Sequence, residues 1–142
     1  MAALLDLHSR KVVGWAMSQR IDAALVQEVL LMALGRRNPS AGLIRHSDRG
    51  SRCACHDDQH RLVAHGIRCS TRRKGDCLDN AVAERFLGSL KRERTAHRND
   101  ATRHEARDDM IDYIEIFYNS RRKHSNLGYV SPNIFEYWTK AA

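Results

Sequence analysis

The sequence predicts an α/β fold in which helices flank a mixed sheet. Two apolar runs near the start, residues 2–7 and 12–17, enclose a polar turn, which is the pattern of a β-hairpin. Beyond them, short apolar runs alternate with stretches of helical periodicity, the order typical of strands joined by helices. With 142 residues and 42% hydrophobic content, the chain can form one core, so a single domain over 1–142 is the simplest organisation.

The two opening strands are expected to pair antiparallel across a turn formed by His8, Ser9 and Arg10. Residues 2–7 carry apolar side chains on both faces, as strands with two neighbours do. Residues 12–17 supply one neighbour, and none precedes Met1, so we expect an exposed edge beside residues 2–7.

A helix is expected to begin at about Asp22, a residue type that caps helix N-termini, and to end at Gly35 and Pro39. Its buried face follows the helical spacing of three and four residues: Leu25, Val26, Val29, Leu30 and Ala33.

A short strand is expected at 43–46, and Asp48 and Gly50 follow its carboxyl end. Open α/β sheets usually bind ligands at that end of their strands. Taken alone, an aspartate before a glycine is more often a turn residue than a metal ligand, so this position needs support from other motifs.

The next helix, 56–64, is expected to end at Gly66, and a further short strand is expected at 67–70. Asp57 and Asp58 are interpreted as caps at the start of this helix, where a carboxylate is stabilising.

A long helix is expected to begin near Asp76 or Asp79. One side of it is apolar: Val82, Ala83, Phe86 and Leu90. At about 100° per residue, a neighbouring stripe is formed by Asn80, Glu84, Leu87 and Lys91. This spacing places Glu84 at the edge of the apolar face, so it need not point to bulk water.

From about residue 100 to 142 the pattern predicts a helical C-terminal extension. A capping box from Thr102 to Glu105 opens one helix, and Ser131 with Pro132 begins another. The first is expected to bury Met110, Ile111, Ile114, Phe117 and Tyr118. We assign the aromatic residues to core packing rather than to base stacking: Phe117, Tyr118, Phe135 and Trp138.

The chain is basic, with 24 Lys and Arg against 17 Asp and Glu, a formal charge of +7. This balance favours polyanionic partners such as nucleic acid. No membrane span or export signal is evident, so a cytoplasmic location with reduced cysteines is expected. Cys53 and Cys55, with nearby histidines, lack the paired spacing of a structural zinc site.

Several motifs together resemble bacterial insertion-sequence transposases with a retroviral-integrase-type catalytic core. They are Leu5 to Ser18, His46 to Gly50, Lys74 to Glu84, Leu90 to Glu93 and Tyr118 to Pro132. The resemblance covers essentially the whole chain and implies a ribonuclease-H-like fold. It also implies Mg²⁺-dependent cleavage and strand transfer of DNA, with transposon ends and target DNA as partners.

That family uses three carboxylates, the DDE motif, of which this chain resembles the last two. Asp48 and Glu84 are 84 − 48 = 36 positions apart, and Lys91, 91 − 84 = 7 positions later, matches a basic position of the family. The first aspartate belongs to a strand before the segment that Met1 to Leu7 resembles, and Asp6 is not its equivalent. The sequence therefore resembles an N-terminally truncated member, unless its start site was misplaced.

The resemblance implies that Asp48 and Glu84 each hold a Mg²⁺ (or Mn²⁺) ion, with the absent aspartate bridging the pair. Two such ions activate the attacking oxygen and neutralise charge at phosphorus, and they prefer carboxylate ligands. Gly50 would leave room for a phosphate, and Asn80 would hydrogen bond around the site. Without the bridging aspartate, we expect weak metal binding and little or no catalysis from this chain alone.

The proposed DNA contacts are Lys91, Arg72, Arg73, Lys74, Arg121, Arg122 and Lys123. Phosphate contacts would make DNA binding steeply dependent on salt, whereas merely solubilising loops would not. Other interpretations stay open. One is a catalytically inactive remnant that binds DNA or a full-length transposase, another is a nuclease of different substrate, and a homo-oligomer is a further possible assembly.

Overall fold

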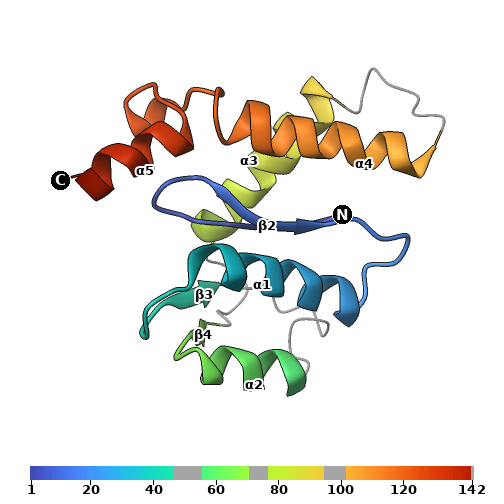
Figure 1. Ribbon diagram of the computed structural model, residues 1–142, viewed down its shortest axis with the longest axis vertical. Coiled ribbons are helices and arrows are strands. Elements are labelled where there is room, and N and C mark those ends of the chain that lie inside the picture. Colours follow the sequence, from blue (N-terminus) through green and yellow to red (C-terminus); the bar gives the residue numbers. More distant parts are fainter. Residues whose placement is uncertain (47–55, 71–76, 95–101, 142) are drawn as a thin grey trace. The chain divides into compact units, whose positions relative to one another are not determined.

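The computed structural model describes residues 1–46, 56–70, 77–94 and 102–141, and the side chains of 77–80 and 141 lie outside the description. Strands and helices follow one another along the chain as Figure 1 shows. The elements are β1 (Ala2–Leu5), β2 (Val12–Ala16), α1 (Ala23–Arg37), β3 (Ile44–His46), α2 (His56–Ala64), β4 (Arg68–Ser70), α3 (Cys77–Glu93), α4 (Arg103–Ile111), η2 (Asp112–Tyr118), η3 (Ser125–Leu127) and α5 (Pro132–Ala141).

The chain forms two compact units. The first comprises Met1–Leu4 and Val13–Ala81, and the second comprises Leu5–Val12 and Val82–Ala142. The architecture is mixed α/β, as predicted. The described strands pair as two small sheets, β1 with β2 and β3 with β4.

The expected hairpin is present. Strands β1 and β2 pair, and the amide of Asp6 donates to the carbonyl of Lys11 at 2.9 Å. Such a short connection requires the strands to run antiparallel. The Asp6 carboxylate accepts hydrogen bonds from the amides of His8 at 2.8 Å and Ser9 at 3.2 Å, which satisfies the turn's backbone.

Helix α1 begins as predicted but ends later. The carboxylate of Asp22 accepts from the amide of Leu25 at 3.0 Å. The helix continues through Gly35 to Arg37, and Asn38 ends it in a left-handed conformation with φ 41°. The prediction that Gly35 stops the helix was wrong because an asparagine also tolerates this conformation and supplies the terminus.

The buried face of α1 consists of Leu25, Val29, Leu30, Ala33 and Leu34. This face differs from the predicted one in two residues. Leu34 is buried although it was not predicted to be, and Val26 is only half-buried. Gly14 in β2 permits close packing here, because an added Cβ would collide with the carbonyl oxygen of Val29.

Strands β3 and β4 are parallel, with Ile44 opposite Arg68 and His46 opposite Ser70. Helix α2 leads from one strand toward the other and ends before Gly66, which has the positive φ of 66° predicted for a helix terminator. The apolar core beneath these elements is formed by Leu30, Leu34, Leu62 and Ile67.

Asp58 lies in the first turn of α2, yet its carboxylate is used elsewhere. It is 1% exposed and pairs with the guanidinium of Arg45 in β3, with Nη1 and Oδ2 2.8 Å apart. This ion pair replaces the capping role expected for Asp58 and fastens α2 to β3.

In the second unit, the C-terminal helices begin where predicted. Thr102 Oγ1 accepts from the amide of Glu105 at 3.2 Å, and Ser131 Oγ accepts from the amide of Ile134 at 3.5 Å. None of the helices in the described part of the chain is long and apolar enough to cross a membrane.

The helix that follows α4 changes form, and its buried face changes with it. Residues Asp112–Tyr118 form a π-helix, in which hydrogen bonds span five residues and each turn is wider. Tyr113 is buried at 2% exposure, whereas Ile111 at 38% and Phe117 at 41% are exposed. The prediction that the latter two are buried was wrong. For Phe117 it assumed an uninterrupted α-helix, whereas Ile111 precedes the π-helix and lies outside the buried side of α4, which carries Asp109 and Met110.

Trp138 also departs from its assignment to the core. It is 55% exposed, and Phe135, one turn earlier, is half-buried with its ring 5.1 Å from that of His8. Tyr118 does pack in the core, edge-on to Phe86 with ring centroids 4.9 Å apart.

Candidate functional site

The parallel pair β3 and β4 defines one edge at which both strands end. His46 and Ser70, the last residues of the two strands, lie opposite each other in the register. The carboxyl ends of the two strands therefore lie at the same edge of the sheet, the position at which α/β sheets usually bind ligands. Asp48 and Gly50 follow β3 in sequence, and the basic residues 72–74 follow β4.

Most of the predicted site residues lie outside the described part of the chain. These are Asp48, Gly50, Arg72, Arg73 and Lys74, together with the side chain of Asn80. Glu84 and Lys91 are described, on α3, and so are the three basic residues 121–123. The pairing of Asp48 with Glu84 stays a prediction.

Glu84 and Lys91 are both exposed on α3. At about 100° per residue, seven residues return Lys91 to within about 20° of Glu84, so the two share one face. The buried face of the helix carries Phe86, Ser89 and Leu90 instead. Glu84 therefore faces away from the packed side, and not at its edge as the sequence suggested, because the three buried residues lie about 120–160° around the helix from it.

A cluster of polar side chains joins the end of α3 to η2 and the turn after it. Arg122 Nη2 lies 2.6 Å from Glu93 Oε1, and its Nε lies 3.3 Å from Glu93 Oε2. The hydroxyl of Tyr113 donates to Glu93 Oε2 at 2.8 Å. The guanidinium also donates to Ser89 Oγ at 3.2 Å and lies 5.8 Å from the ring centroid of Tyr118.

These contacts set the charge states within the cluster. The hydrogen bond from Arg122 lowers the pKa of Glu93, and the same contact raises the pKa of Arg122, so both groups stay charged over a wide pH range. Burial raises the pKa of Tyr113 and raises that of Tyr118 to about 12. Burial, and then the nearby Arg122 charge, lowers the pKa of His124, which favours its neutral form.

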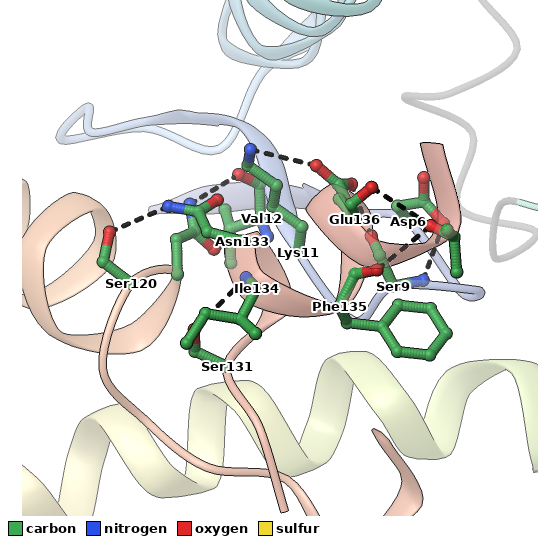
Figure 2. Close-up of polar contacts among 12 residues, drawn as sticks. Asp6, Ser9, Lys11, Val12, Ser120, Ser131, Asn133, Ile134, Phe135 and Glu136 are labelled. Carbon is green, nitrogen blue, oxygen red and sulfur yellow. Dashed lines mark hydrogen bonds and ion pairs between the residues drawn. The ribbon is translucent and has the colours of Figure 1, made fainter. Parts of the chain in front are cut away.

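A second cluster connects the hairpin turn to the C-terminal helix, as Figure 2 shows. Ser9 is 1% exposed, and its hydroxyl donates to Glu136 Oε1 at 2.7 Å. The ammonium of Lys11 lies 3.2 Å from Glu136 Oε2. Helix α5 is thereby fastened to the turn between β1 and β2.

Asn119 extends this cluster in the manner of a paired strand. Its Oδ1 accepts from the amide of Val12, and its Nδ2 donates to the carbonyl of Val12, both at 3.0 Å. Its own carbonyl accepts from the amide of Asn133, and Asn133 Nδ2 donates to Ser120 Oγ (Figure 2). Asn119 therefore links the turn after η2 to both β2 and α5.

Sequence reasoning did not identify either cluster. Glu93 and Arg122 both lie within the quoted family motifs, but nothing in their local spacing indicates that they pair, since they are 29 positions apart. Val12 and Asn119 are 107 positions apart. The sequence offered one signal, which is a polar residue directly after residues expected in the core. Asn119, which follows Tyr118, is an example.

Within the described ranges, no three His, Cys, Asp or Glu side chains form a group suited to a metal ion. Cys53 and Cys55 lie outside those ranges, so the exclusion of zinc stays a prediction. For Mg²⁺, the donor chemistry fits, because Glu84 presents an exposed carboxylate and hard divalent ions prefer such oxygens.

Two family models match this chain, and together they cover almost all of it. Residues 1–77 match a family described as Integrase core domain, and residues 65–132 match a second family with the same description.

Two relatives share more than 40% identity with this chain. The chain is 43% identical over 136 residues to the transposase for insertion sequence element IS904 of Lactococcus lactis, covering 96% of this chain and 54% of that protein. It is 42% identical to transposase InsF for insertion sequence IS3A of Escherichia coli, covering 96% of this chain and 47% of that protein. The chain thus spans about half the length of these relatives.

The fold is shared with solved integrase structures. The catalytic core domain of BIV integrase superposes with a TM-score of 0.67 at 22% identity, covering 97% of this chain and 87% of that chain. A chain of the simian T-cell lymphotropic virus intasome gives a TM-score of 0.66 at 18% identity, covering 92% of this chain and 45% of that chain. The fold is therefore the ribonuclease-H-like fold of retroviral integrase cores.

Proposed function

Because the chain belongs to the integrase core domain family of insertion-sequence transposases, we propose that it acts in DNA transposition through metal-dependent phosphodiester chemistry. The observation that supports this proposal most strongly is the similarity to two transposases over 96% of this chain. The proposed substrates are transposon ends and target DNA.

In this proposal Asp48 and Glu84 hold divalent metal, Mg²⁺ or Mn²⁺. Such ions, when bound, lower the cost of charge on phosphorus and orient the attacking oxygen. The register of β3 and β4 supports the role of Asp48, because Asp48 comes two residues after the carboxyl end of β3 in the sequence, and ligands usually bind at that end of a strand. The outward position of Glu84 on α3 supports the second role, since a buried carboxylate could not reach a DNA phosphate.

Lys91 is proposed to contact the DNA backbone from the same face of α3 as Glu84. A lysine there would attract the phosphate toward the carboxylates and offset their negative charge. Arg72, Arg73 and Lys74 are proposed to contribute further phosphate contacts from the segment after β4.

Binding of a labelled DNA duplex, followed by fluorescence anisotropy across a salt series, tests the nucleic-acid role. The logarithm of the binding constant is expected to fall linearly with the logarithm of salt concentration, by about 0.9 per neutralised phosphate. Lys91→Gln is expected to reduce that slope by about 1, whereas Lys140→Gln, an exposed lysine on α5, leaves it unchanged. A binding constant independent of salt would remove the DNA role.

A non-enzymatic alternative is kept because only two of the three carboxylates that the chemistry needs are assigned in this chain. Such a protein would bind DNA, or a longer transposase, without cutting. Nicking of supercoiled plasmid in Mn²⁺ separates the two functions. Nicking that Glu84→Gln abolishes and Glu28→Gln retains supports the enzyme, while DNA binding without nicking supports the alternative.

A further inference from the structure

The three basic residues after η2 have different surroundings although they are consecutive in sequence. Arg121 and Lys123 are exposed. The side chain of Arg122 is only 26% exposed and forms an ion pair with Glu93. A shared role as phosphate contacts would require all three to present their charges to solvent.

The guanidinium of Arg122 is held on several sides. Two of its nitrogens contact the two oxygens of Glu93, at 2.6 and 3.3 Å, in a forked geometry that a guanidinium forms well. A third hydrogen bond reaches Ser89 Oγ at 3.2 Å, and the ring of Tyr118 lies against the cation. Binding a DNA phosphate would require breaking the contacts with Glu93 and Ser89.

The partners of Arg122 lie on one side of α3. Ser89 and Glu93 are four residues apart, hence one turn apart on the same side. Glu93 follows Glu84 by 93 − 84 = 9 residues, about two and a half turns, so it lies on the opposite side of the helix from Glu84. Arg122 therefore contacts the side of α3 that is opposite to the side carrying Glu84 and Lys91.

We propose that Arg122 is a structural residue that holds the turn after η2 against the side of α3 opposite Glu84 and Lys91 and contacts no phosphate, and that Arg121 and Lys123 alone supply the phosphate contacts of this turn. The inference deepens the proposed function and rests on it for the claim that this turn contacts DNA. In this proposal the three consecutive basic residues do not form a uniform DNA-binding patch. Arg121 and Lys123 face solvent, and Arg122 between them is bound within the protein.

The first test measures the salt dependence of duplex binding for single variants. Lys123→Gln is expected to reduce the slope by about 1, as the loss of one phosphate contact does. Arg122→Gln and Arg122→Lys are expected to keep the wild-type slope. Both should lower the thermal unfolding temperature, because lysine keeps the charge but not the forked contact. A slope that falls in Arg122→Gln and is restored in Arg122→Lys would overturn the proposal.

The second test uses no DNA. Unfolding by urea is compared for Glu93→Gln, Arg122→Gln and the double variant. If the two side chains act as one unit, the double variant is no less stable than the weaker single variant. Additive losses of the free energy of unfolding would overturn the structural role of Arg122. A chain that binds no duplex, yet shows this coupling, would instead refute the proposed function and the phosphate contacts of Arg121 and Lys123, so the two failures are distinguishable.

Discussion

Replacement of Asn119 by alanine is expected to destabilise the second unit strongly. Asn119 is 1% exposed and Val12 is 0% exposed, so water does not replace the lost partner. The substitution leaves the amide and the carbonyl of Val12 unpaired, since each is bonded to Asn119 at 3.0 Å. An unsatisfied buried group costs about 1–3 kcal/mol, so the two together are expected to lower the free energy of unfolding by about 2–6 kcal/mol.

Urea denaturation measures this loss, with two further variants as controls. Asn126→Ala removes an exposed asparagine and is expected to change the free energy of unfolding by less than about 0.5 kcal/mol. Asn119→Leu fills the space without pairing Val12, so it should be destabilised as well. If Asn119→Leu restored wild-type stability, the cost would come from the cavity and the hydrogen-bond reasoning would be refuted.

Two further predictions concern backbone packing and pH. Gly14→Ala should lower the urea midpoint, because the new Cβ would collide with the carbonyl of Val29. Gly35→Ala in α1 meets no atom within 4 Å and should raise the free energy of unfolding by about 0.5–1 kcal/mol. Equal effects of the two substitutions would contradict the packing of β2 on α1. Because the pKa of His124 is lowered from 6.5 in the folded chain, the unfolded chain binds its proton more readily. The stability is therefore present above about pH 6.5 and is lost as pH falls from that value through the lower pKa of the folded state. His124→Gln should flatten this dependence in urea unfolding below about pH 6.5, and an unchanged dependence in His124→Gln would contradict the burial of that ring.

Features encoded within a few residues were predictable from the sequence. The caps at Asp22, Thr102 and Ser131 were identified because each side chain bonds an amide three residues ahead. The hairpin and the alternation of short strands with helices followed from hydrophobic periodicity in the same way. The family resemblance, quoted from motifs, is confirmed by relatives 42–43% identical.

Features that depend on distant residues or on a change of helix type were not predictable. The π-helix Asp112–Tyr118 has no distinct local signal, and its wider turn moved Phe117 to the surface. The pairing of Arg122 with Glu93 and of Asn119 with Val12 depends on the folded chain, because their spacing in sequence carries no periodicity. Charge alone therefore suggested a DNA contact for Arg122, where the structure provides an internal partner.

The central claim is that Asp48 and Glu84 hold divalent metal, and a Mn²⁺ titration followed by electron paramagnetic resonance tests it most directly. The wild-type chain is expected to bind Mn²⁺ weakly but measurably, because only two of the three carboxylates are assigned in it. Asp48→Asn and Glu84→Gln are each expected to weaken binding at least about tenfold, a loss at the lower end of that for perturbed metal sites. The matched variant Glu28→Gln, which changes an exposed glutamate of α1, should bind as the wild type does. Equal Mn²⁺ affinity in Glu84→Gln and Glu28→Gln would contradict the account.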